Sequence, residues 1–239
     1  MCLAYGYAGR IGLKNIVLIP AAGVGARFGA GKPKQYVEIG GKTVLQHTLD
    51  IFLRHRSIDH IAVVLSPEDA FFQTASIEKT SILKCGGETR AETVRNGIDA
   101  LFAAGLVEEG DRILVHDAAR CCLPSEALDR LLAVASESVD GAVLAVPVAD
   151  TLKRADSAGC VEMTVSRQAL WQAQTPQLFP AGLLRRALAV PDLSSVTDEA
   201  SAVEALGVRP LLVLGDSRNL KLTLPQDELI VRLLLAQNA

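Results

Sequence analysis

Residues 15–36 read Asn15-Ile-Val-Leu-Ile-Pro20-Ala-Ala-Gly23-Val-Gly25-Ala-Arg27-Phe-Gly-Ala-Gly-Lys32-Pro-Lys34-Gln-Tyr36, and this stretch decides the fold. The run Ile16–Pro20 is short and continuously apolar, which is typical of a buried strand in a parallel sheet. The glycines that follow admit positive φ and let successive backbone N–H groups converge on phosphate oxygens. Because Arg27, Lys32 and Lys34 lie in the same loop, the stretch predicts a strand that leads into a polyphosphate-binding loop.

Other interpretations of this loop are weaker. The dinucleotide fingerprint G-x-G-x-x-G has Phe28 at its third glycine, and no acidic residue closes a second strand about 20 positions later. The P-loop pattern fails because Gly31-Lys32 is followed by Pro33, and because Tyr36 stands where the pattern ending in Gly41-Lys42-Thr43 requires its first glycine. A surface loop that is rich in glycine by chance is the plain structural alternative. Pro33 argues against it, since proline fixes the backbone that presents the neighbouring lysines.

The composition excludes several classes of protein. The chain has 239 residues, of which 49% are hydrophobic and 21% charged, with a formal net charge of −3. These values are ordinary for a soluble globular protein, and the chain is long enough for one large α/β domain with a well-buried core. Near-neutral charge argues against nucleic-acid binding through a basic surface, and 4% aromatic residues argue against stacking platforms for single strands. The apolar runs are too short for a membrane span.

Neither the cysteines nor the N-terminal residues predict a functional site. Five cysteines without C-x-x-C spacing, together with four scattered histidines, predict neither a zinc site nor a disulfide framework. A reducing, cytoplasmic location is therefore expected. Residues 1–14 contain no apolar stretch typical of a signal peptide, and we expect them to form a disordered extension ahead of a single domain at 15–239.

Strand and helix patterns alternate along most of the chain, which predicts a doubly wound, mostly parallel sheet. Around 148–170 the pattern changes to an antiparallel β-hairpin, which is too poor in large apolar residues to stand alone and is expected to pack against a second subunit. The expected strands are 16–20, 61–65, 112–115, 142–148, 209–214 and 219–223, and the expected helices are 43–54, 69–77, 89–101, 125–136, 181–189, 198–206 and 226–236.

Four polar segments are expected to lie at the carboxyl ends of strands, namely 21–35, 86–93, 116–120 and 216–221. Because ligands bind at the carboxyl ends of strands in open α/β sheets, these segments are expected to converge on one edge. Asp117, directly after a buried strand, is suited to a ribose hydroxyl or to a Mg²⁺ held mostly by phosphates. A helix-capping role is an equally good interpretation of Asp117 alone.

Eight blocks of the sequence resemble, in order, those of the 2-C-methyl-D-erythritol 4-phosphate cytidylyltransferases of the non-mevalonate isoprenoid pathway. Besides the first loop with its Lys-Pro-Lys-Gln continuation, the blocks begin at Gly86, His116, Ala149, Thr164, Thr175, Thr197 and Asn219. The resemblance covers nearly the whole chain from Asn15 onward. It implies the Rossmann-like nucleotidyltransferase fold and transfer of CMP from CTP to 2-C-methyl-D-erythritol 4-phosphate, with Mg²⁺.

The resemblance also implies a role for each matching residue. Those expected around CTP are Ala21, Ala22, Gly23, Gly25, Gly87, Glu88, Thr93 and Asp117. Those expected to stabilise charge on the reacting phosphate are Arg27 and Lys34. Those expected to position the methylerythritol phosphate are Arg167 and Lys221, helped by Thr151, Lys153, Thr175, Asp117, Ala118 and Arg120. The hairpin is expected to act as a dimerisation arm, with Arg167 and Thr151 reaching the partner's site.

Three positions depart from the family pattern. Ala26 replaces an arginine often found beside the catalytic one, Thr93 replaces a serine and keeps the hydroxyl, and Cys121 replaces a proline. Two other functions stay open at this point. One is a cytidylyl- or uridylyltransferase acting on another sugar or polyol phosphate, and the other is a non-catalytic nucleotide sensor.

Overall fold

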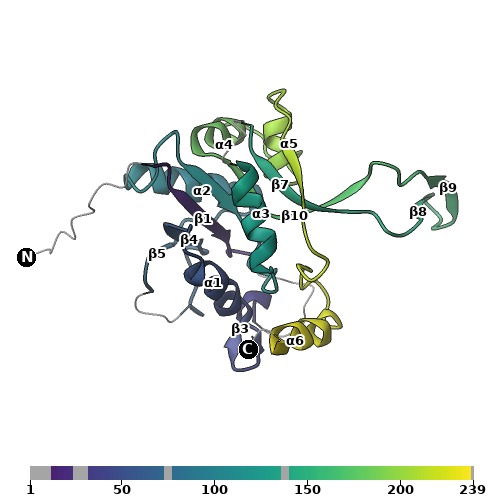
Figure 1. Ribbon diagram of the computed structural model, residues 1–239, viewed down its shortest axis with the longest axis horizontal. Coiled ribbons are helices and arrows are strands. Elements are labelled where there is room, and N and C mark those ends of the chain that lie inside the picture. The colour runs from purple at the N-terminus through teal and green to yellow at the C-terminus, as the bar shows by residue number, and fades with distance from the viewer. Residues whose placement is uncertain (1–11, 24–31, 73–76, 136–139, 238–239) are drawn as a thin grey trace, which may run out of the picture.

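The computed structural model describes residues 12–23, 32–72, 77–135 and 140–237 (Figure 1). Within these residues, seven strands form one central sheet in the order β11-β7-β10-β6-β1-β4-β5. Neighbouring strands are parallel, except that β10 runs antiparallel to both β6 and β7. The expected mostly parallel sheet is confirmed. Its strands are β1 (Asn15–Pro20), β4 (His60–Val64), β5 (Thr80–Leu83), β6 (Arg112–Val115), β7 (Ala142–Pro147), β10 (Trp171–Pro180) and β11 (Leu211–Leu214).

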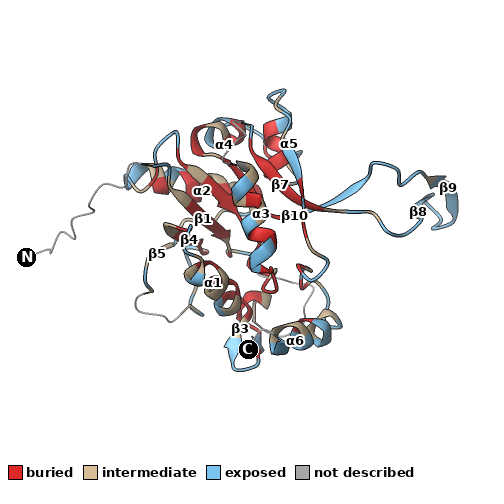
Figure 2. Ribbon diagram, in the orientation of Figure 1, coloured by how far each residue is buried: buried red, intermediate tan, exposed pale blue. Residues whose placement is uncertain are grey.

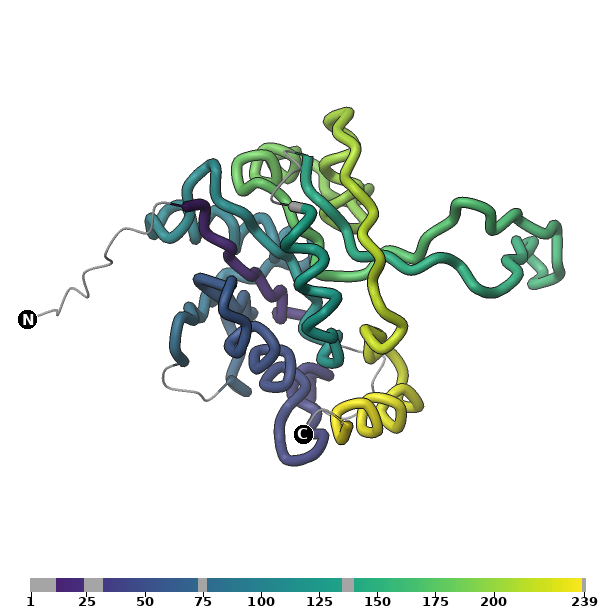
Figure 3. The backbone as a smooth tube through the Cα atoms, in the orientation of Figure 1, coloured from purple at the N-terminus to yellow at the C-terminus, as the bar shows by residue number. Residues whose placement is uncertain are grey.

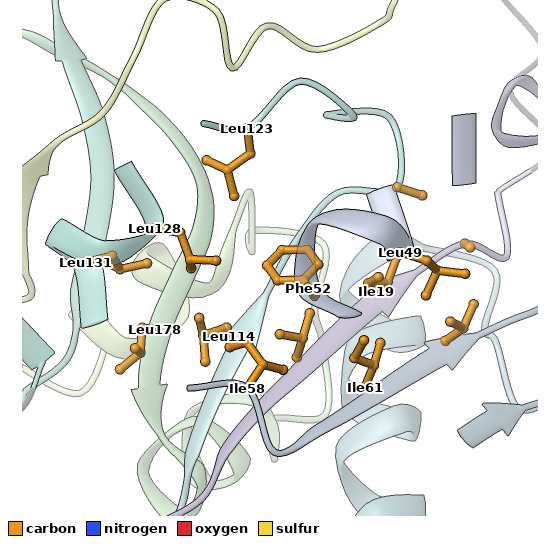
Figure 4. Close-up of a cluster of buried hydrophobic side chains, with 14 of the residues drawn as sticks. Ile19, Leu49, Phe52, Ile58, Ile61, Leu114, Leu123, Leu128, Leu131 and Leu178 are labelled. Atoms are coloured by element: carbon orange, nitrogen blue, oxygen red, sulfur yellow. The ribbon is translucent and has the colours of Figure 1, made fainter. Parts of the chain in front are cut away.

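Helices pack on both faces of the sheet because successive residues of a strand point to opposite sides. Val17 and Ile19 of β1 belong to a core that contains Phe52 and the helices α1 and α3 (Figure 4). Ile16 and Leu18 belong to the core on the other face, with α2, α4 and α5. The fold is therefore doubly wound, with the buried sheet between two helical layers (Figure 2). The helices are α1 (Val44–Arg54), α2 (Arg90–Ala103), α3 (Ser125–Ala135), α4 (Ala181–Leu188), α5 (Glu199–Glu204) and α6 (Asp227–Gln237).

The strand order reverses at β1. From β1 the chain continues outward through β4 and β5, and then crosses back to place β6 on the other side of β1. The carboxyl ends of β1 and β6 therefore lie side by side at a topological switch point, where open α/β sheets bind ligands.

Helix caps form where the sequence predicts them. The side chains of Thr43 and Thr89 accept the backbone N–H of Gln46 and Glu92, and both form complete capping boxes at the start of α1 and α2. The strands expected at 16–20, 61–65, 112–115 and 142–148 are present and shifted by at most one residue at an end.

Two local expectations are corrected by the structure, and one strand was not predicted. The helix expected at 69–77 is absent at the described residues 69–72, because the Asp69 carboxylate instead accepts the backbone N–H groups of Phe71 and Phe72 in a turn. The strand expected at 219–223 is irregular chain. Strand β5 was not predicted; its four residues are all only half-buried at the edge of the sheet, so they lack the continuous apolar run of a central strand.

A two-stranded antiparallel hairpin extends from the sheet. It consists of β8 (Leu152–Ala155) and β9 (Val161–Val165), and these strands pair with each other rather than with the central sheet. The tube in Figure 3 shows this arm reaching well beyond the body of the molecule. Val161 and Met163 of β9 are exposed on it.

At its N-terminal end, the described chain is already part of the fold. The backbone N–H of Lys14 donates to the Asp111 carboxylate at 2.8 Å, and its carbonyl accepts from Arg112 at 2.8 Å. The extension expected at 1–14 otherwise falls mainly on residues 1–11, outside the described residues. In the described part of the chain, no helix has the length and apolar character needed to cross a membrane.

Candidate active site

A cavity of about 570 Å³ lies at the switch point. All four polar segments that were expected to converge there contribute to the cavity or to side chains beside it. The predicted convergence at the carboxyl ends of β1 and β6 is therefore present. The lining residues are Pro20, Ala21, Ala22, Gly23, Lys34, Gln35, Arg90, Thr93, Asp117, Ala118, Ala119, Lys221 and Thr223.

The wall that follows β1 is held by Gln35, a residue to which the sequence analysis gave no role. Gln35 is 4% exposed, and its side-chain amide donates to the carbonyl oxygens of Ala21 at 2.8 Å and Gly23 at 3.0 Å. A Cβ at Gly86 would lie 2.3 Å from the Cβ of Ala22, so only glycine lets the neighbouring segment approach this wall. The wall is thus fixed by one buried amide and one close backbone contact.

Two lysines that are far apart in sequence lie at the cavity. The Lys221 ammonium is 2.8 Å from Oδ2 of Asp117. The Lys34 ammonium donates to the carbonyl oxygen of Leu222 at 3.2 Å, although 188 residues separate the two positions. The irregular segment that carries Lys221 therefore contacts the lysine of the first loop. Both ammonium groups were expected at the site, and the structure brings them together.

Arg90 is the charged lining residue that the sequence analysis missed. Its Nε donates to Oδ1 of Asp117 at 2.8 Å, while Nη1 and Nη2 donate to the two carboxylate oxygens of Glu199 at 2.7 and 3.0 Å. One signal for it was in the sequence. Arg90 is the first residue after the Thr89 cap, where the positive end of the helix dipole disfavours a cation. Such a placement indicates that specific carboxylates lie nearby.

The two carboxylates respond differently to burial. Burial alone would raise the pKa of Asp117, but Arg90 and then Lys221 outweigh it and hold that pKa well below the ordinary value. Burial raises the pKa of Glu199, and the attraction of Arg90 offsets part of that rise. Asp117 is therefore a firmly ionised group at the cavity wall.

Behind this wall, a continuous series of hydrogen bonds connects the segment after β6 with β10. The backbone N–H of Asp117 donates to Thr175 Oγ1 at 3.0 Å, and Thr175 Oγ1 lies 3.1 Å from Nδ1 of His116. Nε2 of His116 lies 3.0 Å from the carbonyl oxygen of Arg120. Since a carbonyl only accepts, His116 is protonated on Nε2 and accepts from the Thr175 hydroxyl on Nδ1. Thr175 is thus placed behind Asp117 rather than on the cavity lining.

Arg120 also lies behind the lining. Its Nη1 donates to the carbonyl oxygen of Asn219 at 2.6 Å, and its Nε is 3.9 Å from Oδ2 of Asp117. The side chain of Asn219 in turn donates to the carbonyl oxygen of Thr175 at 2.8 Å. These contacts fix the segment that presents Lys221.

The polar groups of the segment before α2 form hydrogen bonds with residues close to them in the sequence. Gly87 N–H donates to Thr93 Oγ1 at 3.1 Å, and the Thr93 hydroxyl is 2.9 Å from the carbonyl oxygen of Thr89. Glu88 N–H donates to the Glu92 carboxylate at 2.9 Å. Thr93 lines the cavity, whereas Gly87 and Glu88 stand beside it.

The residues expected on the arm are not brought to this cavity within one chain. Lys153 donates to Thr164 Oγ1 at 2.7 Å across the hairpin, and Arg167 donates to the carbonyl oxygen of Ala149. Thr151 is exposed at the base of the arm. These three residues do not appear among the lining residues. Arg27 and Gly25 lie outside the described residues, so their expected roles stay predictions.

The carboxylates near the cavity do not form a metal-binding cluster. In the described ranges, no three His, Cys, Asp or Glu side chains gather in a way that could hold a metal ion. Both oxygens of Asp117 already accept from cations at 2.8 Å. The donor set therefore fits a Mg²⁺ held mainly by phosphate oxygens, with at most one carboxylate from the protein.

The sequence model of the 2-C-methyl-D-erythritol 4-phosphate cytidylyltransferases matches residues 15–237. The chain belongs to this family. A cytidylyltransferase of that name from Neisseria meningitidis serogroup C is 66% identical over 225 residues, which are 93% of this chain and 97% of the relative. One from Chromobacterium violaceum is 50% identical over 223 residues, 92% of this chain and 97% of the relative. A crystal structure of a 4-diphosphocytidyl-2C-methyl-D-erythritol synthase, 61% identical, matches with a TM-score of 0.84 and covers 94% of this chain and 100% of its own.

A pH dependence of stability follows from His116 in this cytidylyltransferase family member. Burial lowers the pKa of His116 to about 4 from an ordinary value near 6.5, so the unfolded chain takes up this proton first as the pH falls. We expect the free energy of unfolding to lose about 2 kcal/mol from this group between pH 7 and pH 5. Urea unfolding at both pH values measures it, and His116→Gln should lose less stability over the same interval. An equal loss in both proteins, or an NMR titration of His116 near pH 6.5, would contradict the assignment.

Proposed function

We propose that this chain transfers CMP from CTP to 2-C-methyl-D-erythritol 4-phosphate at the cavity beside Asp117. The products are 4-diphosphocytidyl-2-C-methyl-D-erythritol and pyrophosphate. The reaction is the one named for its family. The location rests on one observation, the cavity of about 570 Å³ at the switch point with Lys34, Arg90 and Lys221 on its wall.

The geometry favours catalysis by charge rather than by a covalent intermediate. An oxygen of the acceptor phosphate attacks the α-phosphorus of CTP in line, and the bond to the pyrophosphate oxygen breaks. Two anions must approach, and negative charge grows on the α-phosphate in the transition state, so fixed cations lower the barrier. Lys34 is assigned to that charge together with Arg27, and Lys221 is assigned to the acceptor phosphate.

The remaining residues bind and orient the substrates. The backbone of Ala21, Ala22 and Gly23 is assigned to the cytidine part of CTP, which the buried Gln35 amide supports from behind. Asp117 is the carboxylate that would face a Mg²⁺ held by the phosphates, and such an ion would supply neutralisation of phosphate charge. This last assignment is supported by the position of Asp117 on the lining.

The acceptor site is assigned to two subunits of a homodimer. The support is that Thr151, Lys153 and Arg167 lie on or at the base of an arm that extends away from the body of its own chain (Figure 1). The exposed apolar residues Val161 and Met163 on the arm also favour a partner surface there. We therefore assign Arg167 and Thr151 to the site of the partner. We also expect a cytoplasmic enzyme, since the four described cysteines are free thiols.

The activity is tested by pyrophosphate release from CTP or UTP with methylerythritol, ribitol and glucose phosphates. We expect turnover that requires CTP, Mg²⁺ and 2-C-methyl-D-erythritol 4-phosphate together. Faster turnover with UTP or with another acceptor would replace the proposed substrate, and release with no pair of substrates would refute the proposal.

Loss of a lysine from the cavity should slow the chemical step. In Lys34→Ala we expect kcat to fall by about 10²–10³, as for loss of one donor to a developing oxyanion. Lys42→Ala is the control, because Lys42 pairs with Asp50 on the surface. A Lys34→Ala enzyme with kcat within a few-fold of the unmodified chain would remove Lys34 from the mechanism.

Mixing two inactive variants tests the arm. Arg167→Ala and Lys34→Ala should each be impaired as homodimers. If Arg167 acts in the partner's site, random exchange of subunits gives heterodimers with one intact site, and about one quarter of the full activity should return. Mixing two preparations of Arg167→Ala serves as the control. No recovery despite proven exchange would show that Arg167 does not act in the partner's site.

A further inference from the structure

We propose that Arg90 and Glu199 are positioning residues of the reaction: Glu199 fixes the Arg90 guanidinium, and Arg90 fixes the Asp117 carboxylate beside Lys221. The inference rests on the proposed function of the cavity, and it assigns roles to two residues outside the expected site. Neither residue is proposed to react with the substrates.

Glu199 is buried in its ion pair with Arg90. Its side chain is 1% exposed, and both carboxylate oxygens accept from Arg90. A buried ion pair of this kind contributes little net stability, because the desolvation of two charges offsets their attraction. Arg90 also stands at the positive end of the dipole of α2. Since neither feature favours folding, stability alone does not account for the pair.

The planar guanidinium of Arg90 links Glu199 to Asp117. Because this group is rigid, two hydrogen bonds at its Nη end also fix the direction of its Nε–H group. That group donates to Oδ1 of Asp117 at 2.8 Å, which leaves Oδ2 facing Lys221 at 2.8 Å. A lysine at position 90 has a single terminal nitrogen and lacks this fixed fork. The position of Glu199 therefore determines, through Arg90, the position of the Asp117 carboxylate.

In the proposed reaction, Lys221 turns from Asp117 to a phosphate. Asp117 then keeps the hydrogen bond from Arg90 on Oδ1, so its position stays fixed. Beside Oδ2 stands Nε of Arg120, a buried donor that lacks a hydrogen-bond partner among the described residues and lies 3.9 Å away. A small shift of Arg120 would replace the departing ammonium. Arg90 thus allows Lys221 to change partners without displacing Asp117.

The test replaces the pair without leaving an unpaired charge. In Arg90→Met with Glu199→Leu, both charges are lost together, and such exchanges are commonly neutral for stability. We expect a thermal unfolding midpoint close to that of the unmodified chain, but a kcat lower by about tenfold to a hundredfold, as for a misplaced reacting group. KM for CTP should change less than kcat.

The matched control is the pair Arg185 and Asp99. It is likewise an arginine–carboxylate pair that involves α2, through Asp99, at 3.0 Å, but both side chains are about half exposed and neither lines the cavity. Arg185→Met with Asp99→Leu should keep both kcat and KM. Arg90→Lys is the second test variant, since it keeps the charge at position 90 and loses the fork. Its kcat should fall as well.

Two kinetic results would overturn the inference. One is a folded double variant, or a folded Arg90→Lys, whose kcat stays within about twofold of the unmodified chain. The other is a rise in KM for CTP with kcat unchanged, which would make Arg90 a binding residue. If the double variant does not fold, Arg90→Lys decides alone.

A crystal structure of a folded variant separates this inference from the proposed function. An unmodified chain that releases no pyrophosphate would refute the function, but the position of Asp117 would still be measurable. We expect the Asp117 carboxylate to leave its place beside Lys221 in the variant. An Asp117–Lys221 contact that keeps its 2.8 Å distance would overturn the positioning role whatever the activity.

Discussion

One buried carboxylate, that of Asp117, holds the cationic wall of the cavity together. Taking a carboxylate out of water disfavours its charged form, and the effect is large enough that an isolated group would take up a proton. Arg90 and Lys221, each at 2.8 Å, more than offset that effect. The same two contacts keep the cations from repelling one another at close range. Without Asp117, Lys221 would lose the contact that holds it beside Arg90, whereas Arg90 would still be held by Glu199.

The fold brings these groups together because the strand order reverses at β1. Asp117 follows β6, the Ala21–Gly23 wall follows β1, and the two strands are neighbours. The antiparallel strand β10 then places Thr175 behind Asp117, where its hydroxyl accepts the Asp117 N–H. The irregular segment that carries Lys221 is held by the backbone bond from Leu222 to Ala119 at 2.9 Å. Elements from the whole length of the chain thus meet at one sheet edge.

Local signals predicted much of this arrangement. The apolar run of β1, the capping boxes at Thr43 and Thr89, and the polar segments after strands each depend on neighbouring residues, so they can be read from the sequence. The error at 69–72 also has a local cause, because Asp69 takes the backbone N–H groups of a turn in place of a helix. Strand β5 escaped prediction since its residues are only half-buried at the edge.

The role of Arg90 could not be predicted in the same way. Its two partners lie 27 and 109 residues away, and only the folded sheet brings them to one guanidinium. Position 90 alone showed a cation at the unfavourable end of a helix, which indicates that partners exist but not which ones. Gln35 is a similar case, because a buried amide that holds two carbonyl groups looks like any polar residue in the sequence.

The two cations on Asp117 differ in a way that fits different tasks. Arg90 is bound at three nitrogens and its side chain is 30% exposed, so its position is determined by the protein on both sides. Lys221 is bound through one ammonium on a flexible stem, and its side chain is 42% exposed. An ammonium can rotate from a carboxylate to a phosphate while it keeps its charge, whereas a guanidinium locked between two carboxylates cannot do so without breaking several bonds. The rigid cation therefore holds Asp117 in place, and in the proposed reaction Lys221 is the cation that follows the substrate.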